Sequence, residues 1–299
     1  MPIKTVAILS PGEMGAAVGR ALHDAGFAVV TCLEGRGDFT RKRAEAAGFT
    51  FAETLEALLG EADLVLSILP PEHAPALAGR VAAAMKASGR TPPFADLNAI
   101  APETSRATQV TIEAAGAVYI DGGIVGSPPG KTDKATRIFV SGEHAPLLDA
   151  LGGPEIAIRQ CGPEIGRGSA VKMVYAGITK GTSALHTAAL LAAEKLGVAD
   201  ELHEELAYSV APLYKRMEAT TPSLPATSGR YMGEMREIAR TMEDCGVTPN
   251  FHIGSLEVYE VLNRTPYAAE LRETVDKSRT MRETIRTAAE YVPVKPAAE

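Results

Sequence analysis

The opening of the chain constrains its fold more than any other segment. Residues 3–9 (IKTVAIL) form a short apolar run that ends in the turn Ser10, Pro11 and Gly12, and an alanine-rich helical pattern follows to about residue 25. A second apolar run, residues 27–33, then begins. Strand, tight turn, helix and strand in this order predict a βαβ unit, whose two parallel strands need a right-handed crossover.

The same alternation continues through the first half of the chain. Further strand candidates are residues 64–69, 94–97, 118–120 and 138–141, with helical stretches between most of them. This alternation predicts a parallel or mostly parallel sheet with helices on both faces. After residue 168, strand-like runs disappear and helical sequence dominates. We therefore expect an α/β fold, in which a Rossmann-type doubly wound sheet over residues 1–165 is followed by an all-helical second domain over residues 166–299.

The helical half contains one long uninterrupted pattern. No proline interrupts residues 169–196, and Gly197 is a suitable C-cap. At about 1.5 Å per residue, such a helix would span roughly 40 Å. A breaker cluster at residues 220–228 (TTPSLPATS) separates a middle helical region from the last third of the chain.

Charge and composition exclude several classes of function. The net charge of −7 argues against a nucleic-acid partner, because binding phosphates needs clustered basic side chains. No stretch offers the roughly 20 continuous apolar residues of a membrane helix, and the amino terminus has no signal-peptide pattern. Three widely spaced cysteines indicate reduced thiols, and the histidines lack metal-ligand spacing. We expect a cytoplasmic protein without a metal site.

The first turn carries the clearest chemical motif. Its six residues place Ser10, Gly12 and Gly15 where a dinucleotide fingerprint has three glycines, with a serine as the departure. Such a turn lets backbone N–H groups approach a pyrophosphate at a helix N-terminus. The alternative is that the glycines serve only the tight turn. The predicted cofactor-binding residues here are Ser10, Pro11, Gly12, Glu13, Met14 and Gly15.

The end of the second strand bears on the choice between NAD and NADP. A carboxylate about twenty residues past the turn usually holds the ribose hydroxyls, whereas an arginine accepts a 2′-phosphate. Both types occur, as Glu34 and as Arg36, and the basic residues 41–43 follow. We predict an NAD(P) cofactor with a slight preference for NADP, although residues 42 and 43 also fit a solvated helix start.

Lys172 is the best catalytic candidate. It lies near the start of the long helix, and Tyr175, Ala176, Thr179 and Lys180 follow on one helix face. A lysine near a helix N-terminus in a cleft has a lowered pKa, which suits a general acid or base. From position alone, a surface lysine with an amphipathic stem is the favoured interpretation.

Five segments together carry a family resemblance. They are AILSPGEMG near the start, DLVLSILPP at 63–71, DLNAIAP at 96–102, IDGGIVGSPP at 120–129 and GRGSAVKMVYAGITKG at 166–181. In this combination the chain resembles the 3-hydroxyacid dehydrogenase superfamily, which includes 6-phosphogluconate and 3-hydroxyisobutyrate dehydrogenases. The resemblance covers both domains and is greatest to 6-phosphogluconate dehydrogenase-like proteins with a distinctive helical C-terminal domain.

The resemblance implies roles for individual residues. Lys172 matches the family's catalytic lysine, which takes the hydroxyl proton during oxidation and returns it during reduction. Asn98 matches a polar residue near the nicotinamide and the substrate, and Leu69 with Pro70 matches the loop along the cofactor. The segment that contains Gly122 and Gly123 matches the one that usually binds the substrate carboxylate.

The chain also departs from the family pattern. The usual SGG reads VGS from Val125, and the asparagine one turn after the lysine is Ala176. A sugar phosphate needs charge-assisted contacts that these positions lack, which argues against a 6-phosphogluconate dehydrogenase. Tyr175 is predicted to donate a hydrogen bond to a carbonyl or alkoxide oxygen, and Asn98 is the alternative catalytic residue for orienting that oxygen. Two interpretations fit Arg230, namely a carboxylate-binding residue and a surface ion pair with Glu234.

Together these features predict reversible hydride transfer between a nicotinamide cofactor and a small hydroxy acid or carbonyl compound. Reduction of an imine is the alternative within enzymes, and a non-catalytic dinucleotide-binding sensor is the alternative from another class. Long alanine-rich helices commonly pack across a subunit interface, so we expect a homodimer.

Overall fold

A computed structural model describes residues 2–35, 37–271 and 274–293. The chain divides into two compact units, Met1–Tyr175 and Ala176–Glu299. The predicted division after residue 165 falls just ahead of a long helix, whereas the two units divide inside that helix. No helix among the described residues is long and apolar enough to cross a membrane.

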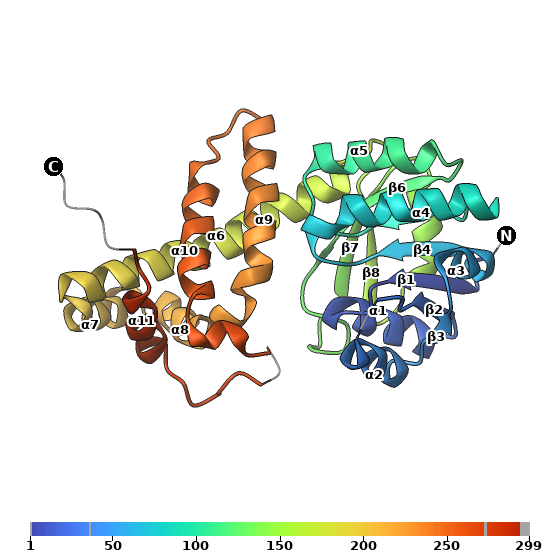
Figure 1. Cartoon of the computed structure of the whole chain (residues 1–299). Helices are drawn as coiled ribbons and strands as arrows, with labels where there is room; N and C mark the ends of the chain where they lie inside the picture. The colour runs from blue at the N-terminus through green and yellow to red at the C-terminus, as the bar shows by residue number, and fades with distance from the viewer. Residues whose placement is uncertain (1, 36, 272–273, 294–299) are drawn as a thin grey trace. The chain divides into compact units, whose positions relative to one another are not determined.

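The first unit is built on one eight-stranded sheet (Figure 1). Its strands are β1 (Thr5–Leu9), β2 (Ala28–Cys32), β3 (Thr50–Ala52), β4 (Leu64–Ser67), β5 (Phe94–Asp96), β6 (Tyr119–Val125), β7 (Thr136–Ser141) and β8 (Ile156–Gln160). Their order across the sheet is β3-β2-β1-β4-β5-β6-β7-β8. The first six strands are parallel and follow the doubly wound order, with a switch point between β1 and β4. The predicted fold class is therefore confirmed.

Two differences from the predicted strands have clear physical causes. β3 and β8 were not predicted, since they are short and carry little apolar periodicity. β6 continues to Val125 instead of ending at residue 120, because its second half pairs antiparallel with β7. The sheet is therefore mostly, not wholly, parallel.

Helices cover both faces of this sheet. They are α1 (Glu13–Asp24), α2 (Asp38–Ala46), α3 (Leu55–Glu61), α4 (Ala74–Ser88) and α5 (Pro102–Glu113), with the short helices η1 (Pro71–His73) and η2 (Ala145–Leu151). Alternate residues of β1 belong to two different apolar clusters. Val6 and Ile8 pack with α1 and η2, whereas Ala7 and Leu9 pack with α3, α4 and α5. This period of two is what a strand buried on both faces requires.

The second unit is helical. It holds the greater part of α6 (Arg167–Leu196), then α7 (Ala199–Ser209), α8 (Ala211–Thr220), η3 (Thr221–Ser223), α9 (Pro225–Asp244), α10 (Asn250–Asn263), η4 (Pro266–Ala269) and α11 (Met281–Glu290). α6 ends before Gly197, whose φ of 72° is left-handed as a C-cap glycine requires. The predicted breaker cluster is shorter than expected, because Pro225 begins α9 and a proline is well tolerated there. α9 and α10 lie side by side (Figure 1).

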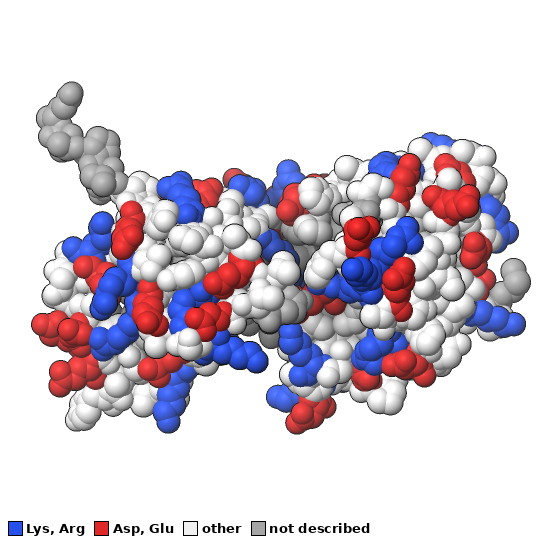
Figure 2. Space-filling model, turned by 60° about the horizontal axis from the view of Figure 1, so that its bottom comes forward, with Lys and Arg blue, Asp and Glu red and all other residues white. Residues whose placement is uncertain are grey.

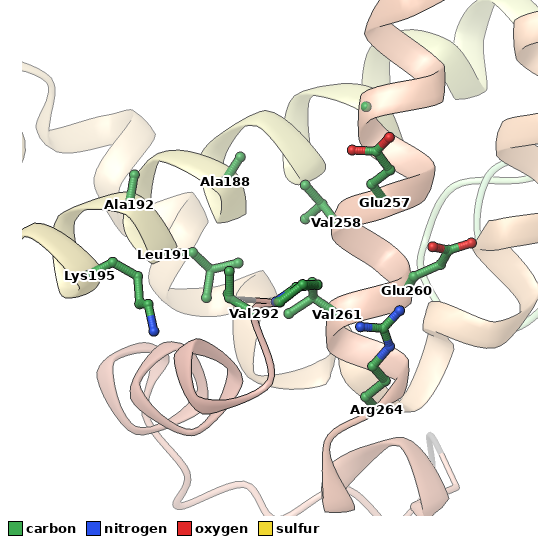
Figure 3. Close-up of a pocket in the computed structure, with 12 residues that line it drawn as sticks. Ala188, Leu191, Ala192, Lys195, Glu257, Val258, Glu260, Val261, Arg264 and Val292 are labelled. Carbon is green, nitrogen blue, oxygen red and sulfur yellow. The ribbon is translucent and has the colours of Figure 1, made fainter. Parts of the chain in front are cut away.

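A groove of about 410 Å³ lies in this second unit (Figure 3). Apolar side chains of α6 and α10 line it, among them Leu191 and Val258, and Lys195 and Arg264 also lie along it. The predicted site residues are not among its lining residues. On the face that Figure 2 shows, basic and acidic side chains are interspersed over each unit.

Candidate active site

The turn between β1 and α1 is tightly folded. Ser10 has a φ of 69°, and it is the one non-glycine residue with a positive φ in the described part of the chain. The N–H of Gly12 donates to the carbonyl of Ser10 at 2.8 Å. A Cβ on Gly15 would lie 2.7 Å from that same carbonyl oxygen. Ser10 thus holds the left-handed conformation of a glycine, at a cost of about 1 kcal/mol, and Gly15 is needed for the turn to close.

Gly12 leaves the start of α1 open. A Cβ there would meet no atom within 4 Å, and no side chain caps the helix at this N-cap residue. The N–H groups of a first helical turn have no partners inside the helix, so an uncapped N-terminus suits an anion such as a pyrophosphate. Pro11 is buried and Met14 packs against the core below the turn.

Glu13 adds a charge to this turn, and a second charge compensates it. Its carboxylate pairs with the ammonium group of Lys131 at 3.1 Å, although residue 131 lies far along the chain in the segment between β6 and β7. Lys131 therefore offsets a carboxylate that would otherwise repel a bound phosphate.

The end of β2 presents the residues predicted to choose the cofactor. Glu34 lies just past this strand, and Arg80 of α4 pairs with its carboxylate at 3.3 Å. Arg36 lies outside the described residues. Two nearby arginines cover aromatic rings instead, Arg41 over Phe51 and Arg43 over Phe39. Arg80 is the basic residue beside Glu34 that the sequence patterns did not single out.

Asn98 ties two strand ends together. Its Oδ1 accepts from the backbone N–H of Leu69 at 2.6 Å, and its Nδ2 donates to the Oγ of Ser67 at 2.9 Å. The side chain is buried. It thereby fixes the turn after β4, where Leu69 and Pro70 lie, against the end of β5. The structure brings these three predicted residues together.

Lys172 and Gly123 are also brought together. Gly123 lies on β6, and a Cβ on it would lie 2.4 Å from the Cβ of Lys172. A Cβ on Gly122 would lie 2.7 Å from the Leu97 side chain and 2.8 Å from the carbonyl of Phe139. Both glycines are therefore required by close packing. Pairing of β5 with β6 ends at Asp121, so β6 continues past the end of its neighbour.

Tyr175 and Arg230 belong to different units. Tyr175 is 43% exposed on α6, at the end of the first unit. Arg230 lies on α9, where its Nε is 3.7 Å from a carboxylate oxygen of Glu234 and its guanidinium covers the ring of Tyr231. Glu234 also pairs with Lys180. The ion-pair interpretation of Arg230 thus has a structural counterpart, and Lys180 is held by α9.

A buried polar cluster in the first unit was not predicted. Asp121 of β6 is fully buried, and its neighbour across the sheet is Asp96 of β5. Burial raises the pKa of Asp96 to about 7, and the Asp121 carboxylate raises it too, while the N–H of Asn98 lowers it. The sequence signal was a carboxylate inside each of two otherwise apolar runs, since buried charges need a reason.

The described residues hold no candidate metal site. There, no group of three or more His, Cys, Asp or Glu side chains is arranged to hold a metal ion.

Two family models match the chain. The NAD-binding domain of 6-phosphogluconate dehydrogenase matches residues 5–151, which hold the turn after β1 and the sheet up to β7. A domain of unknown function (DUF1932) matches residues 193–262, in the helical unit. The first match supports a nicotinamide dinucleotide as the cofactor.

Solved structures share the fold over nearly the whole chain. The conserved protein MTH1747, described as structurally similar to 3-hydroxyacid dehydrogenases, is 28% identical over 86% of this chain and 96% of its own, with a TM-score of 0.62. A 3-hydroxyisobutyrate dehydrogenase of Mycobacterium tuberculosis with L-serine is 20% identical over 92% and 98%, with a TM-score of 0.65. An imine reductase of Bacillus cereus is 17% identical over 91% and 97%, with a TM-score of 0.51.

Proposed function

Because a 6-phosphogluconate dehydrogenase-type NAD-binding domain and a DUF1932 domain both match the chain, we propose that it transfers a hydride between NAD(P) and a small hydroxy acid or its carbonyl form. The observation that carries this proposal is the uncapped start of α1 with open space at Gly12, in the same unit as Lys172. A bound nicotinamide would supply or accept the hydride, and the protein's own groups bind, orient and move the proton.

The proposed binding residues for the dinucleotide follow the strand ends. Residues 10–15 would hold the pyrophosphate through backbone N–H groups, and Glu34 would accept a hydrogen bond from a ribose hydroxyl. Leu69 and Pro70 would line the cofactor. Asn98 would hold this cofactor-lining loop in place, because its side chain accepts a hydrogen bond from the backbone N–H of Leu69.

The proposed chemistry centres on Lys172. Its amine would take the hydroxyl proton during oxidation and return it during reduction. Tyr175 would donate a hydrogen bond to the reacting oxygen. For the substrate carboxylate, we propose the backbone of β6 at Gly122 and Gly123. The lack of the usual serine at Val125 favours a small substrate with few polar groups.

Preference for NADP is part of the proposal. Arg80 supports it, because its guanidinium lies beside Glu34, where a ribose 2′-phosphate would be recognised. Arg36 follows Glu34 by two residues in the sequence, and we propose it as a second arginine for this phosphate.

Replacement of Lys172 tests the catalytic proposal. Lys172→Ala should lower turnover by roughly two to four decades, the usual range for a general acid or base, and leave NADPH affinity nearly unchanged. Turnover is measured on a panel of 3-hydroxy acids that includes 3-hydroxyisobutyrate and L-serine, and affinity by NADPH fluorescence. Lys86→Ala, on the exposed side of α4, is the matched control. Wild-type turnover in Lys172→Ala would remove this lysine from the mechanism.

The same preparation separates the alternatives. If the protein is an imine reductase, cyclic imines are reduced with NADPH while hydroxy acids are not oxidised. A dinucleotide-binding sensor would bind NADPH and turn over neither class. Lys172 favours the dehydrogenase, because proton transfer to and from a hydroxyl needs such a group.

We also propose that the protein is a homodimer. α6 exposes large apolar side chains at Ile178 (66% exposed) and Leu185 (68% exposed), which lie seven residues apart and so on one helix face. A second copy of the chain that packs on this face would remove their apolar surface from water.

A further inference from the structure

β6 and the start of α6 are joined through a single carboxylate. Asp121 is fully buried at the point where β6 leaves β5. Its Oδ1 accepts from the Oγ of Ser105 at 2.6 Å and its Oδ2 from the Oγ of Ser141 at 2.7 Å. These contacts come from α5 and β7, so Asp121 is held from both sides.

The same carboxylate caps α6. Its Oδ2 accepts from the backbone N–H of Gly166 at 3.1 Å and of Ser169 at 3.0 Å, and its Oδ1 accepts from the Ser169 hydroxyl. The N–H of Gly168 donates to the Oγ of Ser141 at 3.0 Å. Three N–H groups at this helix start, those of Gly166, Gly168 and Ser169, are thus satisfied by the buried Asp121 carboxylate and the Ser141 hydroxyl, an arrangement that the helix dipole favours.

Glycines let the two backbones touch along the next turn. A Cβ on Gly168 would lie 2.9 Å from the Cα of Gly122 and 3.0 Å from the Asp121 carboxylate. One helical turn further, the stem of Lys172 occupies the place that a side chain on Gly123 would need. The first two turns of α6 therefore rest on β6 without intervening side chains.

From this geometry we infer that Asp121 and Gly123 are positioning residues for Lys172. Asp121 fixes the first turn of α6, and the bare backbone of Gly123 fixes the stem of the lysine on the strand. This inference rests on the proposed catalytic role of Lys172. It assigns Gly123 an action through the lysine, in addition to the proposed contact of its backbone with a substrate.

A double-mutant cycle tests the role of Gly123. In Gly123→Ala the new methyl group must displace the Lys172 stem, and a misplacement near 1 Å costs roughly 100-fold in turnover. We expect kcat for the fastest 3-hydroxy acid of the panel to fall about 10–100-fold, with NADPH affinity within about twofold of wild type. In a Lys172→Ala background, Gly123→Ala should lower kcat no further, because contacting residues that act as one unit are not additive.

Gly60→Ala is the matched control, since a Cβ at this α3 glycine meets no atom within 4 Å. It should keep the wild-type kcat. Unchanged kcat in Gly123→Ala, or an equal loss with and without Lys172, would overturn the inference. If Lys172→Ala alone were fully active, the proposed catalytic role of Lys172 would fail instead.

Amide hydrogen exchange tests Asp121 without any substrate. Asp121→Asn replaces an acceptor oxygen by an N–H donor, so the amides of Gly166 and Ser169 should exchange at least about tenfold faster. Asp63→Asn is the control, because Asp63 accepts from two backbone N–H groups at the start of the chain. Faster exchange in this variant should be confined to the amides of Lys4 and Thr5. Wild-type protection of the α6 amides in Asp121→Asn would show that this carboxylate does not hold the helix.

Discussion

Gly12 and Gly15 lie three residues apart in one turn, yet a side chain would meet different surroundings at each. At Gly15 a Cβ strikes the carbonyl of Ser10, whereas at Gly12 it enters open space. The backbone of Gly12, with φ −69° and ψ −167°, is one that alanine adopts freely. At the residue scale, the first glycine is therefore free to serve a ligand and the second serves the fold.

Gly12→Ala should separate binding from folding. We expect the free energy of unfolding to stay within about 0.5 kcal/mol of wild type, since the methyl group meets nothing. NADPH affinity should fall at least about tenfold, because the methyl group occupies the approach of the pyrophosphate to the α1 N-terminus. Urea unfolding and NADPH fluorescence titration measure the two effects. An unchanged dissociation constant would mean that this turn does not hold the pyrophosphate.

Asp96 gives the protein a pH-dependent stability. Its folded-state pKa of about 7 lies above the roughly 3.9 of an exposed aspartate, so the folded state binds this proton more tightly. The contribution is fully present below about pH 4 and is lost as pH rises through about 7. Between pH 5 and 8, we expect this group to lower the free energy of unfolding by roughly 2–3 kcal/mol.

Asp96→Asn should remove that loss, because an amide does not titrate. The measurement is urea unfolding of both proteins at several pH values from 5 to 8, with the slope against pH as the readout. Asparagine changes the hydrogen bonds of this buried site, so its absolute stability is not the test. Parallel pH profiles for the two proteins would contradict the raised pKa.

At the scale of elements, the first βα turn shows what the sequence could predict. The bounds of β1 and β2 lie within two residues of the strands predicted at 3–9 and 27–33, and α1 ends near the predicted residue 25. These bounds were predictable because glycine and proline mark the ends of the apolar runs. β3 and β8 escaped prediction, since they take their place from neighbours in the sheet and not from a strong pattern of their own. Tertiary pairing likewise extended β6.

The residues of the candidate site also divide into those that the sequence could predict and those that it could not. Local motifs pointed to the turn at residues 10–15 and to Lys172 near the start of the long helix, and the family resemblance pointed to Asn98 and again to Lys172. Asp121 was missed, because its partners come from α5, β7 and the start of α6, which are far apart in the sequence. Arg80 was missed for a similar reason, since nothing in α4 indicates that it faces the end of β2.

At the scale of the whole molecule, the apolar face of α6 predicts the association state. Light scattering at micromolar concentration should give about twice the 31.4 kDa mass of one chain. Leu185→Glu should shift the protein to the mass of one chain, because a charge would then be buried in the interface. Val110→Glu, at a residue 70% exposed on α5, is the matched control and should stay dimeric. A wild-type mass of one chain would contradict the dimer.

The continuity of α6 has a consequence for dissecting the protein. The helix begins on β6 and runs past Tyr175 into the second unit without a linker. An isolated helix needs about 12–15 residues in water, so a stub cut at that residue would keep its order only through its contacts with β6, those of Asp121 among them. The NAD-binding half can therefore be excised only by cutting through a helix, and the order of the reactive amine would then depend on that one strand.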